Sequence, residues 1–398
     1  MSYNNYQKSS SSRSYSFNSR PTRNFKRKIV KDNINPARFI SPAKTVEPVV
    51  FVPENKFEDF EVSQTIKDNI VQKGFTTLSP IQDQAIPVGL AGQDVIGIAN
   101  TGTGKTVAFA IPVINKLIKN KASNALIIAP TRELALQISL EFRSIGKSTG
   151  LSEAILIGGT PIGPQLRSLH SNPKIVIGTP GRIKDHLERS SLNLSSFDTV
   201  VIDEVDQMLD MGFINDVTHI LSKLATPRQS FFFTATMDEK VKTLINTFSH
   251  DPVTISVKTG STVDTVEQNI IKYESKGQKT DKLHTLLIDP TVKKALVFDD
   301  TQRSVERLSN ELQIRGFSVD SIHGGKSQGQ RKRALSRFRE NEINILVATD
   351  VAARGIDISD ISHVINFSTP KTYDDYVHRI GRAGRAGRTG FALTFIES

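Results

Sequence analysis

A glycine-rich loop in the first half of the chain contains residues that could bind the phosphates of a nucleotide. It follows an apolar run at 94–99 and precedes a stretch with helical periodicity. Gly102 and Gly104 permit backbone conformations that turn successive N–H groups toward an anion, and the start of the helix adds positive potential. In a loop of the G-x-x-x-x-G-K-[ST] type, Lys105 would reach the β and γ phosphates and Thr106 would bind Mg²⁺. The predicted loop consists of Ala99, where this pattern has Gly, and of Asn100, Thr101, Gly102, Thr103, Gly104, Lys105 and Thr106.

Two adjacent carboxylates supply a second chemical signal. Asp203 ends the apolar run at 199–203 and Glu204 follows it, and open α/β sheets bind ligands at the carboxyl ends of their strands. Asp203 would bind Mg²⁺ through its water ligands, and Glu204 would position and activate an attacking water molecule. Alone, an acidic strand end is usually a solvated edge, and a glycine-rich loop can be a turn with a surface lysine. The combination of both motifs in one chain predicts hydrolysis of a nucleoside triphosphate.

Arginines recur at every third position in the glycine-rich segment 378–388. Phosphoryl transfer needs positive charge near the γ-phosphate in its transition state, and Arg382 or Arg385 could supply it as an arginine finger. The phosphate loop lies in the first half of the chain and these arginines lie in the second. Hydrolysis would therefore require two domains to close on each other. A glycine–arginine patch that binds nucleic acid is the alternative interpretation of this segment.

The elements that must position these residues alternate along the chain as short apolar runs and helical stretches. This alternation predicts α/β domains in which a mainly parallel sheet is flanked by helices. The pattern breaks and then resumes, so we predict two such domains, at 47–255 and 267–398, joined by a linker at 256–266. The expected strands lie at 94–99, 125–130, 174–179, 199–203 and 231–236, then at 268–275, 294–300, 318–323, 344–350, 363–368 and 390–397. Expected helices of the first domain include 105–119, 132–147 and 180–189.

Most of the excess positive charge lies in the first 46 residues. The chain has 51 basic and 41 acidic residues, and residues 1–46 contain ten of the basic ones against a single acid, Asp32. This Ser- and Asn-rich tail has too little apolar surface to offset its ordering entropy, so we predict that it is disordered. Its cations and aromatic rings suit a nucleic-acid-binding arm, whereas a solubilising tail or an organelle transit peptide would share this composition.

The composition also excludes several classes of protein. The chain contains no Cys, which excludes disulfide-stapled folds, thiolate metal sites and a Cys nucleophile. It has no run of about 18 apolar residues, so we expect no membrane-spanning helix, and its N-terminus lacks the apolar core of a secretory signal. We expect a cytoplasmic protein, and we expect its core to be monomeric.

In their order along the chain, these motifs resemble those of the DEAD-box family of ATP-dependent RNA helicases, over residues 57–396. Phe57, Phe75 and Gln82 resemble the segment that reads adenine in this family, and a Gln amide can both donate to and accept from the edge of that base. Aromatic residues of the core are the alternative interpretation of Phe57 and Phe75. The resemblance implies two tandem RecA-like domains, ATP and Mg²⁺ as cofactors, and RNA as the partner.

The resemblance also implies roles for single residues. Asp357 would reach the ribose of ATP, His378 would tie the arginine segment to the acidic motif, and Arg382 and Arg385 would be the arginine fingers. The residues implied to bind the RNA backbone are Thr131, Arg132, Gly158, Gly159, Thr179, Arg182, Gln328, Arg331 and Thr349. The residues implied to couple hydrolysis to strand separation are Asp206, Thr234 and Thr236.

The implied activity is RNA-stimulated ATP hydrolysis coupled to domain closure, bending of one RNA strand and local unwinding of short duplexes. Because the implied contacts are to the RNA backbone, we expect weak sequence preference and strong salt dependence. An ATP-controlled RNA clamp that does not unwind and a DNA-directed translocase are the alternatives. The sequence departs from the family at Val205, where Ala is usual, and two extra methyl groups could overpack the catalytic strand end.

Overall fold

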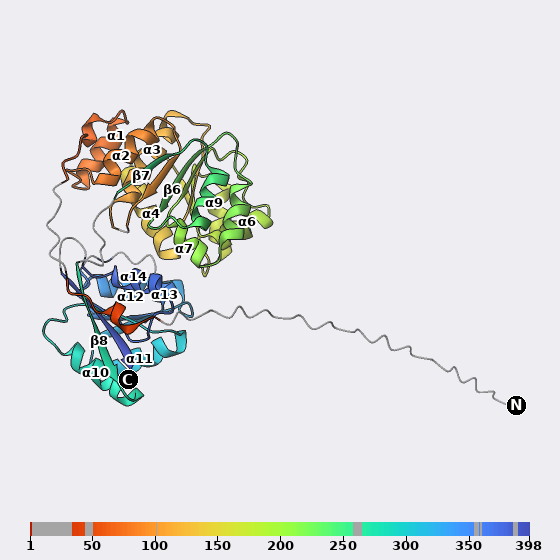
Figure 1. Ribbon diagram of the computed structural model, residues 1–398. Helices are drawn as coiled ribbons and strands as arrows, with labels where there is room; N and C mark the ends of the chain where they lie inside the picture. Colours follow the sequence, from red (N-terminus) through yellow and green to blue (C-terminus); the bar gives the residue numbers. More distant parts are fainter. Residues whose placement is uncertain are drawn as a thin grey trace.

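A computed structural model of the 398-residue chain shows two α/β domains, one above the other in Figure 1. The residues that the structure describes are 1, 34–43, 51–100, 102–257, 265–353, 358, 360–384 and 389–398. Three predicted site residues, Thr101, Asp357 and Arg385, lie outside these ranges, as do most of the predicted tail and linker. Within the described ranges, every helix is too short or too polar to cross a membrane.

The first domain is built on a seven-stranded sheet in the order β3-β4-β2-β5-β6-β1-β7, with every pair of neighbours parallel. The central strands are buried because helices cover both faces of the sheet. The two edge strands, β3 and β7, are more exposed, and neither was among the expected strands. The strands are β1 Val95–Ile98, β2 Ala125–Ile128, β3 Glu153–Leu156, β4 Ile175–Gly178, β5 Thr199–Ile202, β6 Gln229–Thr234 and β7 Val253–Ser256.

Apolar clusters fill both faces of this sheet. On β6, Phe231 and Phe233 point into one cluster and Phe232 into the other, because side chains alternate along a strand. The helices are α1 Gln64–Gln72, α2 Pro80–Leu90, α3 Lys105–Lys119, α4 Arg132–Ile145, α5 Ile162–His170, α6 Pro180–Glu188, α7 Val205–Asp210, α8 Ile214–Leu221 and α9 Glu239–Phe248, with a 3-10 turn, η2, at Phe57–Asp59.

The second domain is built on a six-stranded parallel sheet in the order β10-β11-β9-β12-β13-β8. Its strands are β8 Val266–Tyr273, β9 Ala295–Phe298, β10 Val319–Ile322, β11 Ile345–Ala348, β12 His363–Asn366 and β13 Gly390–Glu397. Its helices are α10 Lys276–Leu287, α11 Gln302–Ile314, α12 Gln328–Arg339, α13 Asp350–Ala353 and α14 Tyr373–Ile380. The predicted α/β class with mainly parallel sheets is confirmed in both domains.

Residues 34–43 depart from the prediction of a disordered tail that reaches residue 46. They form a 3-10 turn, η1, at Pro36–Phe39, and the Phe39 side chain is completely buried in the core of the second domain. Ser41 pairs in antiparallel fashion with Gln268 on the edge strand β8. The prediction is wrong for this segment because one aromatic residue and an open strand edge suffice to order it, which average composition cannot reveal.

Candidate functional site

The strands of the first sheet all end at one edge, and the predicted site residues of the first domain lie along it. In the sheet order, β5, β6 and β1 are neighbours, and they lead to Asp203, Thr234 and the phosphate loop. On the other side of β5, the strands β2 and β4 lead to Thr131 and Thr179. The sheet order thus separates a nucleotide half of this edge from a half that carries the predicted RNA-binding residues.

The phosphate loop has the conformation that its glycines predict. Gly102 and Gly104 have φ angles of 82° and 89°, in the left-handed region that other residues avoid. Helix α3 begins at Lys105, so the free N–H groups of its first turn face the loop. The buried Lys105 ammonium donates to the Ala99 carbonyl at 3.0 Å, and Thr106 lies beside it, half-buried. The described part of the loop therefore has a conformation suited to an anion.

Side chains hold this loop from within and from α2. The Thr103 hydroxyl donates to the Asn100 carbonyl at 2.8 Å. Gln82 Nε2 donates to the Gly104 carbonyl at 3.1 Å, while its Oε1 accepts from the Ser79 N–H at 3.0 Å. A Cβ atom on Gly104 would lie 2.4 Å from Gln82 Nε2, so this close approach requires glycine. Gln82 thus joins the segment resembling an adenine reader to the phosphate loop.

The two aromatic residues of that segment differ in burial. Phe57 is 6% exposed and belongs to the core of the first domain. Phe75 lies 6.4 Å from it, centroid to centroid, and is only half-buried. Of the two rings, only Phe75 is exposed enough to contact a base. Phe57 agrees better with the alternative interpretation, a residue of the core.

The two carboxylates at the end of β5 are nearly inaccessible to solvent, at 2% for Asp203 and 4% for Glu204. Asp203 Oδ1 accepts from the Glu204 N–H at 3.0 Å, and Glu204 has a φ of 56°. Glu204 Oε2 is buried and has no hydrogen-bond partner among the residues that the structure describes. A buried acceptor of this kind is suited to a ligand, because an unpaired polar atom otherwise destabilises the fold.

Burial raises the pKa of both carboxyl groups. The pKa of Glu204 rises to about 7, because burial and the Asp203 charge disfavour its ionised form more than the Lys105 and Arg382 charges favour it. The pKa of Asp203 is raised mainly by burial and is opposed by Lys105. A carboxyl with a pKa near the working pH can exchange a proton with a reacting water molecule. The charge of Arg382 acts on Glu204 across the gap between the domains.

Among the described residues, few side-chain oxygen atoms at this site could bind Mg²⁺. No group of three or more His, Asp or Glu residues within the described ranges forms a ready-made metal site. The donors that fit are a buried carboxylate, Asp203, directly after β5, and a hydroxyl, Thr106, in the first turn of α3 after β1; β6 lies between these two strands. This donor set suits Mg²⁺, which keeps several waters and binds through one or two protein oxygens together with substrate phosphates.

The predicted coupling residues are brought together by one carboxylate. Asp206 Oδ2 accepts from the Ala235 N–H at 3.1 Å, the Thr236 N–H at 2.9 Å and the Thr236 hydroxyl at 3.1 Å. The Thr234 hydroxyl donates to the Thr236 carbonyl at 2.7 Å. The start of α7 is therefore tied to the loop that follows β6, and a shift of one would move the other.

In the other half of the edge, Arg132 and Arg182 lie against loop backbone. A Cβ atom on Gly159 would fall 2.1 Å from Arg132 Nη1, and one on Gly158 would fall 3.4 Å from Arg132 Nη2. Arg182 donates to the Thr160 carbonyl at 3.2 and 3.3 Å. A groove of about 500 Å³ opens here, lined by residues of both domains. Its lining includes Thr131, Arg132, Gly158, Thr179, Arg182, Gly324, Arg331 and Val351.

Two predicted RNA-binding residues of the second domain bind a carboxylate of the first. Arg331 Nη2 lies 2.6 Å from Glu133 Oε2, and Gln328 Nε2 donates to Glu133 Oε1 at 3.2 Å. The side chains of Glu133 and Arg331 are 4% and 8% exposed. Thr349, at the end of β11, is also buried. Sequence reasoning missed Glu133, although it follows Arg132 in the motif already assigned to RNA.

Helix α14 carries the predicted His378 and leads to Arg382. Both residues line a small pocket with Asp350 and Arg379. Arg379, which the sequence analysis gave no role, is 2% exposed and forms a bidentate pair with Asp350 at 2.5 and 2.8 Å. It also donates to the Ser368 carbonyl at 2.7 Å. Arg379 thus fixes α14 to α13 and to the end of β12.

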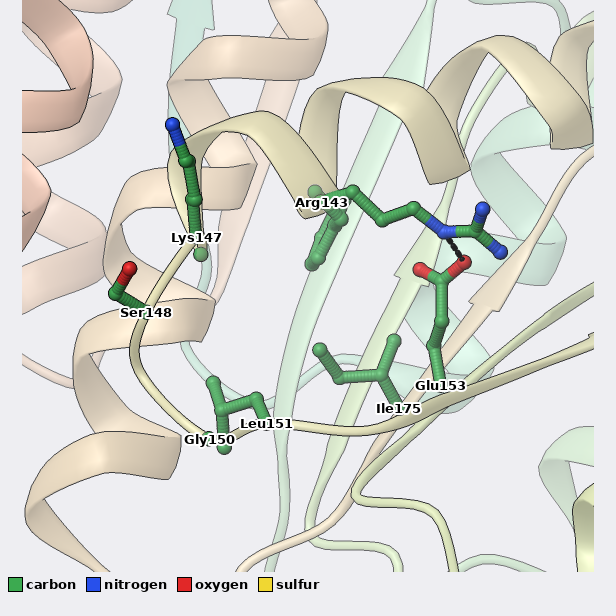
Figure 2. A pocket seen from close by; sticks show the side chains of 9 residues that line it. Arg143, Lys147, Ser148, Gly150, Leu151, Glu153 and Ile175 are labelled. Atoms are coloured by element: carbon green, nitrogen blue, oxygen red, sulfur yellow. Dashed lines mark hydrogen bonds and ion pairs between the residues drawn. The ribbon is translucent and has the colours of Figure 1, made fainter.

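A second cavity, of about 210 Å³, lies at the far end of α4 (Figure 2). Lys147 and Gly150 line it, together with the Arg143–Glu153 pair, whose Nε and Oε1 atoms are 2.6 Å apart. None of the predicted site residues within the described ranges lines this cavity. It lies at the C-terminal end of α4, whereas the predicted RNA-binding Arg132 is at the start of that helix.

Comparison with known proteins shows the family to which the chain belongs. The family model described as DEAD/DEAH box helicase matches residues 79–244, and that of the helicase conserved C-terminal domain matches residues 278–387. The chain is 45% identical over 345 residues to the ATP-dependent RNA helicase CshA of Listeria monocytogenes, covering 86% of this chain and 66% of that protein. It is 45% identical to the DEAD-box ATP-dependent RNA helicase CshA of Bacillus subtilis, covering 85% and 69%. The chain belongs to the DEAD-box family of ATP-dependent RNA helicases.

Solved structures show the likeness in the fold as well. S. cerevisiae Dbp5 bound to RNA and ADP BeF3 superposes with a TM-score of 0.76 at 27% identity, covering 86% of this chain and 89% of that one. Mss116p bound to single-stranded RNA and AMP-PNP gives 0.74 at 30% identity, covering 85% and 73%. The predicted pair of RecA-like domains is confirmed.

Proposed function

We propose that this protein couples RNA-stimulated ATP hydrolysis to closure of its two domains on one strand of RNA. The observation that carries the proposal is the contact of the two domains at the candidate site, where Arg331 Nη2 lies 2.6 Å from Glu133 Oε2 and the charge of Arg382 favours the ionised form of Glu204. Glu204 would accept a proton from the attacking water, and Arg382 would stabilise charge on the γ-phosphate. Lys105 would bind the phosphates. Mg²⁺, when held by Asp203 and Thr106, would neutralise phosphate charge.

The RNA strand would occupy the groove between the domains. Arg132 and Arg182 would bind its phosphates together with the loop N–H groups around Gly158 and Gly159, so binding would be insensitive to sequence. The likeness to Dbp5 and Mss116p, whose structures contain RNA and a nucleotide, supports a closed arrangement of this kind. We further propose that closure bends the strand and opens short duplexes. Arg385 and Asp357, outside the described residues, would be a second arginine finger and a ribose ligand.

An RNA clamp that does not unwind is the second candidate function. The ion pair between Glu133 and Arg331 favours it, because a buried link between the domains could hold them closed around RNA. In that function, ATP would control the lifetime of the complex rather than the pairing of strands. The expected cytoplasmic location and monomeric core remain predictions.

Steady-state ATP hydrolysis tests the proposal when measured without nucleic acid, with single-stranded RNA and with DNA of the same sequence. We expect stimulation by RNA alone, because recognition of the RNA strand would involve its 2′-hydroxyl groups. Equal stimulation by DNA, or turnover indifferent to both, would contradict the assignment of RNA as substrate. A companion assay of strand release from a short duplex separates the two candidates, since the clamp would hydrolyse ATP without releasing strands.

A further inference from the structure

Residues 34–43 bind to the second domain through aromatic contacts with α14. This segment is drawn in red in Figure 1, where it lies on the lower domain. The buried Phe39 ring lies 4.7 Å from the Tyr376 ring, centroid to centroid. The Arg38 guanidinium lies over the Tyr373 ring at 3.7 Å from its centroid. Both aromatic partners belong to the same eight-residue helix.

Backbone and side-chain hydrogen bonds add to these contacts. Ser41 N donates to the Gln268 carbonyl at 3.1 Å and its carbonyl accepts from Gln268 N at 2.8 Å. The Tyr376 hydroxyl donates to Gln268 Oε1 at 2.9 Å, so the helix and the edge strand are joined where the segment binds. Asn35 Oδ1 caps η1 by accepting from the Ala37 N–H at 3.0 Å. The segment is therefore an integral part of this face of the domain.

The helix that receives the segment also carries the cationic end of the candidate site. His378 and Arg379 lie in its last turn, and Arg382 follows two residues beyond its end. A helix of two turns is not stable by itself, so its position depends on what packs against it. Its supports include the pair between Arg379 and Asp350, the packing of Ile380 in the core of the domain, and the contact of Phe39 with Tyr376.

We propose that residues 34–43 are a positioning element for Arg382, acting through α14. The inference rests on the proposed function, because it assumes that Arg382 acts on the nucleotide phosphates. Removal of the Phe39 ring would let α14 shift and would misplace the guanidinium relative to Glu204. Displacements of about 1 Å at a catalytic group can reduce turnover by as much as about 100-fold. Phe39 touches no reacting atom and would be a positioning residue.

The test uses the full chain carrying Phe39→Ala, compared with Phe39→Leu and Ile40→Ala. We expect Phe39→Ala to lower kcat at saturating RNA about tenfold and to leave ATP affinity without RNA unchanged, since the phosphate loop lies in the other domain. Phe39→Leu should restore most of the turnover because it refills the site. Ile40 is the matched control, since it is adjacent and 51% exposed, and its variant should behave as the unaltered protein does.

Wild-type kcat in a folded Phe39→Ala protein would overturn the inference, and so would an equal loss in Ile40→Ala. If Phe39→Ala does not fold, Arg38→Ala replaces it, because Arg38 is exposed and its side chain lies over the Tyr373 ring at the surface. A twofold to threefold lower kcat would then support the inference, and an unchanged kcat would refute it. Arg382→Ala, measured in parallel, distinguishes failure of the proposed function from failure of the positioning role. If turnover is lost in Arg382→Ala but not in Phe39→Ala, only the positioning role is refuted.

Discussion

The two domains present different kinds of group to the cleft between them. The first domain supplies buried acids and the anion-binding loop, which lie directly after strands and are held by bonds within that domain. The second supplies cations: Arg331 pairs with Glu133 of the first domain, and Arg382 follows helix α14, which the pair between Arg379 and Asp350 holds in place. On the proposed function, this difference predicts that nucleotide binding needs only the first domain, whereas turnover also needs the second domain correctly positioned.

Glu204→Gln should have the largest effect, because it removes the proposed proton acceptor and leaves the phosphate loop intact. We expect ATP binding to persist and turnover to fall by about 100-fold or more. Equilibrium nucleotide binding and steady-state hydrolysis measure the two quantities. Glu239→Gln is the control, since the Glu239 side chain is 87% exposed. Normal turnover by Glu204→Gln would contradict the separation of binding from catalysis.

Disruption of the ion pair between Glu133 and Arg331 should have the second-largest effect. Arg331→Glu would place two carboxylates together in a buried site, and we expect the RNA concentration for half-maximal stimulation to rise about tenfold or more. The double change Glu133→Arg with Arg331→Glu should restore most of the affinity. If Arg331 served mainly to bind RNA phosphate, the double change would not restore it. Lys242→Glu, in an exposed pair with Glu239, is the control and should leave RNA affinity unchanged.

The raised pKa of Glu204 predicts that turnover depends on pH, with a smaller effect than that of the two substitutions above. Water activation needs the carboxylate, so kcat/KM should rise as the pH passes through about 7 and then level off. Because the folded pKa is above its usual 4.5, this group favours the folded state at low pH, and that contribution is lost as the pH rises from 4.5 through about 7. A profile that is flat between pH 5.5 and about 8 would refute the assignment. Glu204→Gln should lack the rising limb.

Val205→Ala should have the smallest effect on activity. Val205 is completely buried in the cluster on one face of the first sheet. Loss of two methyl groups should lower the free energy of unfolding by about 1–3 kcal/mol and leave turnover within about twofold. Denaturant unfolding and steady-state hydrolysis test both parts. A gain in stability would instead mean that Val205 overpacks the strand end, as the departure from the family pattern suggested.

Local motifs explain why much of the first domain was predictable. The phosphate loop, its strand and its helix are contiguous, and α3 begins and ends at the expected residues, Lys105 and Lys119. In the same way, Asp203 directly follows the apolar strand β5, and Thr234 is the last residue of β6. The carboxyl edge of a parallel sheet then brings these residues together without further information.

The features that sequence reasoning missed depend on contacts between distant residues. Glu133 and Arg331 are 198 positions apart, and nothing local to either one signals the pair. Phe39 finds its site on α14, and no periodicity marks a single aromatic residue. Arg379 shares a motif with the predicted fingers, but its burial against Asp350 follows only from the packing of α14. The edge strands β3 and β7 were not predicted, because strands that are only partly buried have short and weak patterns of apolar residues.

The most direct test of the account measures the distance between the domains. The chain contains no Cys, so two introduced cysteines, Val71→Cys and Ile314→Cys, can carry a dye pair, and both positions are exposed, at 66% and 87%. Single-molecule energy transfer should show a closed state that is populated when ATP and RNA are both present and not with either alone. The same transfer efficiency under all conditions would contradict a catalytic site that is completed across the two domains.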